Sequence, residues 1–284
     1  MRRLLMLAIA VLALGAASPA PAKNVVIQIA KTGFSPATAA VAAGDTVTWK
    51  NVDTSPHQVV SDAGAFRSNV LQPGQTFSHT FDSGGTFAYH GGLHPNLKGS
   101  IVVNAVSVTL SRRVAIAGAA IRLGGSVSSG RAGETVRIAV RPYGAKARQV
   151  LVSTDANGEW SLRVHPLIRT TYQASWNGAT SRQTVAFVRP RIGFRRIGRS
   201  TFGITVLGAD SFAGRYVTVA RWLSRTHHFR YLRRVYLTDS ATTDNLSVAH
   251  VRLQVRHGTR LRVFMSRSQA GPGYLDGHSN FIVA

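Results

Sequence analysis

Short segments of alternating apolar and polar residues run through the first third of the chain, with turn residues between them. Alternation with a period of two is typical of strands that bury one face, and the 3.6-residue period of an amphipathic helix is absent here. Turns are indicated by glycine, proline and aspartate, as in Ala43-Gly44-Asp45. Strands of this length and spacing predict a Greek-key sandwich of two sheets. The expected strands are residues 24–29, 37–41, 46–49, 76–81, 86–90 and 99–103.

The chain beyond residue 104 keeps a β pattern and contains two related segments. The run AGETVRIAVRPY at 132–143 has a counterpart in AGRYVTVARWLS at 213–224, and residues 170–188 have one in residues 259–283. Similar segments in the same order indicate two copies of one domain. Pro190 lies between the copies, and its ring is expected to stiffen the connection.

The N-terminal residues have the composition of an export signal. Arg2 and Arg3 precede an apolar run over residues 4–14, and Ala20-Pro21-Ala22 fits a cleavage site. No later stretch reaches about 18 apolar residues, so we expect no transmembrane anchor. The mature protein is therefore expected to be secreted or periplasmic, in the cell envelope. The expected division is an export signal over residues 1–22 and domains over 23–104, 105–188 and 189–284.

Basic residues are concentrated in the last two domains. The whole chain has 34 Lys and Arg against 11 Asp and Glu, a net charge of +23. Residues 23–104 hold five basic and four acidic residues, whereas residues 105–284 hold 27 and seven. A surface this cationic binds anionic polymers or headgroups through counterion release. We expect an anionic cell-envelope polymer rather than nucleic acid as the partner, unless the arginines are simply solvated surface.

The chain contains no cysteine, which limits the chemistry available to it. Thiolate ligation, iron–sulfur clusters, cysteine nucleophiles and dithiol redox reactions are all excluded. The sequence also has no Gly-x-Ser-x-Gly elbow, no His-Glu-x-x-His motif and no phosphate-binding glycine loop before a helix. We therefore do not expect an enzyme.

The most specific motif is FAYHGGLHPNLKGSIVV at residues 87–103. Together with SPHQVV around His57, it resembles the metal-binding end of plastocyanin- and amicyanin-type cupredoxins. The resemblance continues in GDTVTWKN at 44–51 and LQPGQTFSHTF at 71–81, and it covers nearly all of residues 25–103. It implies a cupredoxin-like Greek-key sandwich for the first domain.

The second domain resembles the immunoglobulin-like repeats of bacterial secreted proteins. Its clearest matching segments are DANGEWSLRVHP at 155–166 and TTYQASW at 170–176. The third domain is expected to be a more divergent copy. The fold class expected for the whole protein is all-β, a cupredoxin-like sandwich followed by two immunoglobulin-like sandwiches.

The resemblance also assigns the copper ligands, which in this family are two histidines, a cysteine and usually a methionine. It places the two histidine ligands at His57 and His94. The cysteine position holds Gly91, however, and the methionine position holds Leu97. Strand alternation points His90 away from this site, so we do not expect it to be a ligand. Blue-copper electron transfer requires the thiolate, and the resemblance therefore implies copper ancestry without a blue site.

The sequence is compatible with three states of this site. Two imidazoles with water or carbonyl ligands can hold Cu(II); Gly91 can leave a hole for an external donor such as a small thiol; or both histidines can be packed residues without metal. The leading hypothesis is an exported copper-binding cupredoxin with a redox or copper-donor partner. The alternative is a structural or adhesive cell-envelope protein whose basic immunoglobulin-like domains bind anionic polymers.

The remaining histidines and aromatic residues are expected to be structural. His79 lies outside the motif, as a surface or core residue. His227 and His228 are adjacent, so on a strand they face opposite sides and cannot form a metal pair. Four aromatic residues among the arginines are expected in domain cores rather than on stacking surfaces: Trp160, Trp176, Trp222 and Tyr274.

Overall fold

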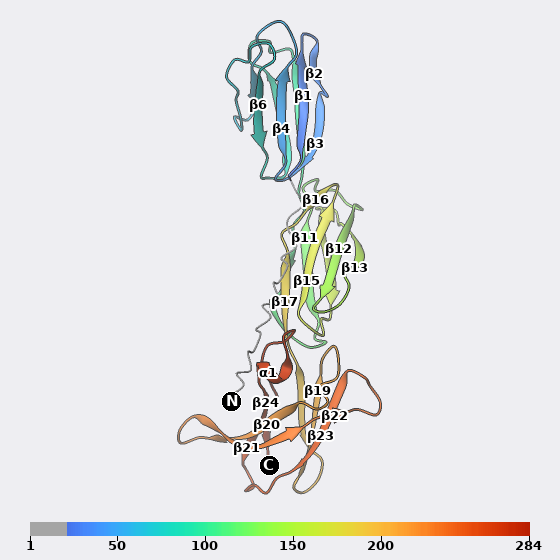
Figure 1. Cartoon of the computed structure of the whole chain (residues 1–284), viewed down its shortest axis with the longest axis vertical. Helices are drawn as coiled ribbons and strands as arrows, with labels where there is room; N and C mark the ends of the chain where they lie inside the picture. Colours follow the sequence, from blue (N-terminus) through green and yellow to red (C-terminus); the bar gives the residue numbers. More distant parts are fainter. Residues whose placement is uncertain (1–21) are drawn as a thin grey trace, which may run out of the picture.

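The computed structural model describes residues 22–284, and these residues are almost entirely β. Figure 1 shows three β modules arranged end to end, with the first at the top and the third at the bottom. The only helix of the described part, α1 (Arg267–Ala270), has four residues. No helix among residues 22–284 has the length and apolarity needed to cross a bilayer. The expected all-β class is confirmed, whereas the expected export signal falls almost wholly outside the described residues.

Eight strands form the first module as two four-stranded sheets. The sheet orders are β2-β1-β4-β6 and β3-β8-β7-β5. β1 pairs with β4 in parallel, as β3 does with β8, and the other neighbours are antiparallel. The strands are β1 (Asn24–Ala30), β2 (Gly33–Ser35), β3 (Thr38–Ala42), β4 (Thr46–Asn51), β5 (Val59–Ser61), β6 (Thr76–Thr80), β7 (Gly85–Gly91) and β8 (Lys98–Asn104).

Alternation in the sequence explains the core of this module. Ile27 and Ile29 of β1 and Trp49 of β4 are fully buried, while residues between them on each strand face outward. Tyr89 and Ile101 of the other sheet pack against them, and the Trp49 and Tyr89 ring centroids lie 5.4 Å apart. Removing these large side chains from water is the dominant favourable term in folding.

Two strands of the first module were not indicated by the sequence pattern. β2 and β5 have three residues each, which is too few to display a period of two. The six expected strands all exist, and their ends lie within two residues of the expected ones. Boundary differences of this size are normal, because strand ends depend on hydrogen bonding as well as on side-chain pattern.

The second module contains a main sheet and a smaller one. The main sheet has the order β10-β17-β15-β12-β13, with β16 added to β15, and the smaller sheet has the order β14-β11-β9. Its strands are β9 (Thr109–Leu110), β10 (Val114–Ile116), β11 (Ile121–Ser126), β12 (Thr135–Pro142), β13 (Arg148–Ser153), β14 (Glu159–Val164), β15 (Thr170–Trp176), β16 (Ala179–Thr180) and β17 (Thr184–Arg189).

The third module is also built from two sheets. Their orders are β18-β19-β23-β22 and β21-β20-β24-β25, with β26 added to β24. The strands are β18 (Arg191–Arg196), β19 (Thr201–Leu207), β20 (Tyr216–Leu223), β21 (His228–Tyr236), β22 (Thr238–Asp239), β23 (Leu246–Arg252), β24 (Arg260–Met265), β25 (Gly277–His278) and β26 (Ile282–Val283).

The two repeated sequence runs occupy corresponding strands. β12 and β20 each begin three residues into their run. β12 lies between β13 and β15, and β20 lies between β21 and β24 in the same way. The opposite sheets also correspond, because β11 pairs with β14 and β19 pairs with β23. The strand pairing therefore agrees with two copies of one unit.

The second and third modules share a packed junction. Ala117, Leu167 and Ile168 of the second module belong to the hydrophobic cluster of the third. The backbone N–H of Leu275 donates to the carbonyl of Val188 at 2.8 Å. The connection is thus held by apolar burial and backbone hydrogen bonds, in addition to the rigidity of the proline between β17 and β18.

Candidate metal site

The loops that carry the two expected ligands lie at the free end of the first module. At the other end, Asn104 donates to the carbonyl of Asn177 in the second module at 3.1 Å. The N–H of Ala43 donates to the carbonyl of Asn104, so β4 starts at this junction and runs away from it. The loop after β4 holds His57, and the loop between β7 and β8 holds His94. Both loops therefore project at the end that Figure 1 places at the top.

Asn51, at the end of β4, fixes the first of these loops. Its side chain is fully buried, and its amide nitrogen donates to the carbonyls of Ser55 and Leu71 at 2.9 Å each. Its amide oxygen accepts the N–H of Asp53 at 2.9 Å. Since a buried amide that lost these partners would cost free energy, the hydrogen bonds define one conformation for the loop.

His57 is held with one ring nitrogen satisfied and the other free. Its side chain is only 2% exposed, and Nε2 lies 2.9 Å from Oδ2 of Asp53. This hydrogen bond holds the pKa of Asp53 below its ordinary value, and an ionised carboxylate can only accept. In the neutral imidazole Nε2 therefore carries the proton, and the lone pair lies on Nδ1. That Nδ1 is buried and has no hydrogen-bond partner among the described residues.

His94 faces His57 from the second loop. The two ring centroids lie 5.0 Å apart with an interplanar angle of 60°. With metal–nitrogen distances of about 2 Å, two imidazoles that share one ion at a near-tetrahedral angle have centroids roughly 5 Å apart. His94 itself is exposed, so the pair consists of one buried and one solvent-accessible imidazole.

The positions of the missing sulfur ligands contain no replacement donor. Leu97 is partly buried and packs against the core of the first module. A Cβ at Gly91 would lie 2.7 Å from the carbonyl oxygen of His94. The turn that places this oxygen is hydrogen-bonded, because Leu97 N donates to it at 3.0 Å and Gly91 N donates to the carbonyl of Leu97 at 2.9 Å.

The residues present therefore fit two-imidazole binding and do not fit a blue-copper centre. Of the three possibilities open from the sequence, a hole at Gly91 for an external donor is disfavoured, since the backbone of His94 fills that space. Within residues 22–284, no group of three or more His, Cys, Asp or Glu side chains is arranged to hold a metal ion. A further ligand could be water, a backbone carbonyl or a group supplied by another molecule.

The other histidines do not join this pair. His90 Nδ1 lies 2.6 Å from Oδ1 of Asp62, on the partly exposed face of β7. His79 packs edge-on against Phe81 with ring centroids 4.9 Å apart. His227 and His228 are exposed in the third module, far along the chain from the pair. The sequence motif thus selected the two histidines that meet. Asn51 lies within the matching segment at 44–51 but was given no role there, and Asp53 lies outside the matching segments; these two residues position the loop and His57.

Comparison with known proteins agrees with the motif. A family model described as "Cupredoxin-like domain" matches residues 3–103. Amicyanin-alpha of Methylorubrum extorquens is 36% identical over 101 residues, which cover 34% of this chain and 85% of that protein. The chain belongs to the cupredoxin family. This confirms the resemblance of the first module to cupredoxins. The match does not extend to the second and third modules.

Other cupredoxins match over the same part of the chain. Amicyanin of Paracoccus denitrificans is 37% identical over 84 residues, which cover 28% of this chain and 64% of that protein, just under two thirds of its length. Plastocyanin of Scenedesmus fuscus is 32% identical over 83 residues, covering 25% of this chain and 85% of that protein. Among solved structures, a purple cupredoxin from Nitrosopumilus maritimus is 30% identical and covers 28% of this chain and 98% of that one, with a TM-score of 0.27.

Proposed function

We propose that this cupredoxin is an exported copper-binding protein that holds Cu(II) between His57 and His94. The observation that carries the proposal is the buried Nδ1 of His57, which has no hydrogen-bond partner among the described residues, in a ring whose centroid lies 5.0 Å from that of His94. A buried polar atom without a partner costs about 1–3 kcal/mol. A metal ion at this atom would remove that cost.

The donor set favours copper and binding rather than electron transfer. Imidazole is a good ligand for Cu(II), and Cu(II) heads the affinity order of the divalent first-row metals. The carboxylate of Asp53 at Nε2 orients the His57 ring and increases its basicity, as second-shell carboxylates do in metal sites. The sulfur ligands that define a blue centre are absent, so the bound ion would lack the intense blue colour, and a copper donor or acceptor is the expected partner.

The exposed position of His94 agrees with a carrier role. His57 provides the fixed, buried ligand, and His94 provides one that solvent and a partner protein can reach. An ion held by two protein ligands keeps coordination positions for water or for a donor group on the partner. Copper transfer then needs no opening of the module core.

A Cu(II) titration of the metal-free protein, residues 23–284, tests the proposal. We expect one site of micromolar or tighter affinity by calorimetry, with two nitrogen ligands in the electron spin resonance spectrum. His57→Ala and His94→Ala should each weaken binding at least 100-fold. The matched control is His90→Ala with His79→Ala, which removes two imidazoles of the same module outside the pair and should leave the site unchanged. Equal affinity in His57→Ala with His94→Ala and in the native protein would overturn the proposal.

A further inference from the structure

One sheet of the third module exposes an unusual outer face. On β24, Leu261, Val263 and Met265 are buried in the core, so the alternating residues face outward. Residues of β20, β21 and the segment before β26 complete this surface. We call it the arginine-aromatic face, and its members are Trp222, Phe229, Arg260, Arg262, Phe264 and Phe281.

Strand register explains how these side chains meet. Ala220 lies opposite Arg262 on β24 and opposite Tyr231 on β21, and directly opposed residues have side chains on the same face. Ala220 is fully buried although it points outward, because larger neighbours cover it. Trp222 lies opposite Phe229 in the same way. A small residue at the centre of the sheet thus allows a continuous aromatic layer above it.

The aromatic rings form a packed floor. The Phe229 centroid lies 4.7 Å from that of Phe264, 4.9 Å from that of Trp222 and 5.6 Å from that of Phe281, the last in a stacked arrangement. All four side chains remain partly exposed. Edge-to-face and stacked contacts of this kind restrict each ring to one orientation.

Two guanidinium groups lie over this floor. The Arg262 guanidinium lies 4.4 Å from the Phe281 centroid and 6.0 Å from that of Phe229, and its Nε donates to the carbonyl of Ser279 at 2.8 Å. Arg260 lies 4.5 Å from the Phe281 centroid. Neither arginine forms a salt bridge with any residue that the structure describes. The N–H groups of Arg260 and the remaining N–H groups of Arg262 therefore carry uncompensated charge.

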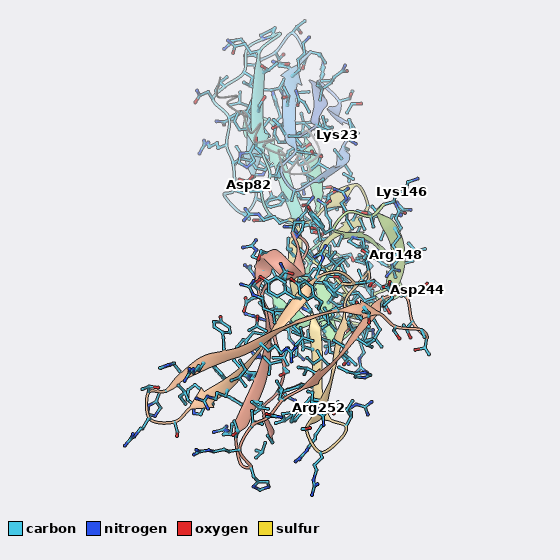
Figure 2. All side chains as sticks on the ribbon, turned by 60° about the horizontal axis from the view of Figure 1, so that its bottom comes forward. Lys23, Asp82, Lys146, Arg148, Asp244 and Arg252 are labelled. Atoms are coloured by element: carbon cyan, nitrogen blue, oxygen red, sulfur yellow. The ribbon has the colours of Figure 1, made fainter. Side chains whose placement is uncertain are left out.

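The strands of this sheet contain no acidic side chain that could compete, and Asp276, which precedes β25, is paired with Arg189. β20, β21, β24, β25 and β26 have no Asp or Glu. Residues 189–284 hold 16 Arg and four Asp in total. Figure 2 shows basic side chains extending from this module, with Arg252 at its free end. A negative ligand would therefore approach the arginine-aromatic face through a positive field.

We propose that the arginine-aromatic face binds an acidic polysaccharide through its carboxylate groups. The guanidinium fork matches a carboxylate with two parallel hydrogen bonds. Because Arg260 and Arg262 are already ordered on the rings, little side-chain entropy is lost when the anion binds. Tyr231 and Tyr236, 73% and 65% exposed, extend the surface along β21, so a linear chain could follow the sheet.

The same geometry disfavours nucleic acid. Single-stranded binding relies on free aromatic faces for base stacking. The ring of Phe281 is occupied by Arg260 and Arg262, so bases would have to stack on the exposed Tyr231 and Tyr236 rather than on the ring that the two guanidinium groups contact. Direct readout of a duplex needs an element that enters a groove, and this surface is the flat face of a sheet. Carboxylates on a flexible sugar chain need neither a free aromatic face nor an element that enters a groove.

Binding of polygalacturonate to residues 23–284 tests this proposal, with dextran as the neutral polymer, a single-stranded oligonucleotide and vesicles containing anionic lipid in parallel. Arg260→Gln with Arg262→Gln should weaken polygalacturonate binding at least tenfold. The matched control is Arg137→Gln with Arg163→Gln on exposed positions of β12 and β14, which removes the same charge and should change binding less than twofold. Thermal unfolding of each variant verifies that it is folded.

A variant with lysine in place of both arginines distinguishes bidentate binding by the guanidinium groups from attraction by positive charge alone. Arg260→Lys with Arg262→Lys keeps both charges but cannot form the bidentate contact, and it should also lose at least threefold in affinity. Full binding by this lysine variant, or equal losses in the face and control variants, would show general electrostatic attraction and overturn the proposal. Binding of the oligonucleotide or the vesicles without binding of polygalacturonate would overturn it as well.

Discussion

Asp53→Asn tests whether the carboxylate of Asp53 prepares His57 to bind metal. Oδ2 of Asp53 lies 2.9 Å from Nε2 of His57, and the two side chains are 11% and 2% exposed. Oδ1 of the same carboxylate accepts the N–H of Thr54 at 2.7 Å. The Asp53 side chain therefore has a fixed position, and an asparagine of nearly equal size can replace it without a cavity.

The substitution changes which ring nitrogen carries the proton. A carboxylate only accepts hydrogen bonds, which keeps the proton of His57 on Nε2 and the lone pair on Nδ1. The amide of an asparagine can instead donate to Nε2, which stabilises the tautomer with a proton on Nδ1. That tautomer cannot bind a metal through Nδ1. Since second-shell changes typically cost 10–100-fold in metal affinity, we expect a loss of about this size for Cu(II).

Calorimetric titration with Cu(II) measures this loss, and nitrogen NMR of the imidazole reports the tautomer directly. The matched control is Asp62→Asn, which makes the same chemical change at the pair formed by His90 and Asp62. Asp62 is 53% exposed and outside the proposed site, so the control should bind copper as the native protein does. Native affinity in Asp53→Asn, or an equal loss in both variants, would refute the role given to Asp53.

Three further predictions concern the packing of the first module. In Gly91→Cys the new Cβ would meet the carbonyl oxygen of His94 at 2.7 Å. We therefore expect a loss of about 1–3 kcal/mol in unfolding free energy and no intense blue absorption with Cu(II). A strong visible absorption band with Cu(II) would contradict this prediction. In Gly99→Ala the Cβ would enter the ring of Tyr89, and urea unfolding should show a loss of about 1–3 kcal/mol; native stability would disprove the contact. Burial raises the pKa of Tyr89 from 10.0 to about 12. Between these pH values the unfolded chain loses a proton that the folded module keeps. The unfolding free energy should therefore fall by about 2–3 kcal/mol as the pH rises through this range. Urea unfolding of Tyr89→Phe from pH 9 to 12 should show a smaller fall, and an unchanged slope would exclude Tyr89 as the cause.

The sequence predicted most of the first module because its strands bury one face. Residues such as Ile27 and Trp49 mark every second position, and this period survives in the folded protein. The short strands β2 and β5 were missed, since three residues carry no period. In the later segments the sequence showed two similar runs of residues, but not the corresponding strand pairing of β12 and β20.

The proposed site was predictable in part, for a different reason. His57 and His94 follow from the family motif, but alternation along a strand cannot give the distance between two loops. Asp53 and Asn51 lie in or before an irregular loop, where no period relates one residue to another. Whether the space at Gly91 is open was left undecided by the sequence, because only the folded turn shows that the carbonyl of His94 enters it.

Trp222 shows the limit of composition as a guide. Trp160, Trp176 and Tyr274 lie in cores, as expected, with at most 8% of their surface exposed. Trp222 was expected there too, but it belongs to the outer layer of its sheet, where it packs edge-on against Phe229. Both faces of this sheet carry large apolar residues, so the pattern of β20 alone could not reveal which face meets the core.

The two proposed binding sites should act independently, because they lie at opposite parts of an extended molecule. His57 and His94 are at the free end of the first module, and the arginine-aromatic face is on the third, with the whole second module between them (Figure 1). Substitutions far apart without shared partners have additive effects. Arg260→Gln with Arg262→Gln should therefore leave Cu(II) affinity unchanged, just as the two histidine substitutions should leave polygalacturonate binding unchanged. Coupling in either titration would mean that the first module contacts the third in solution, and that the polymer and the metal compete for one surface.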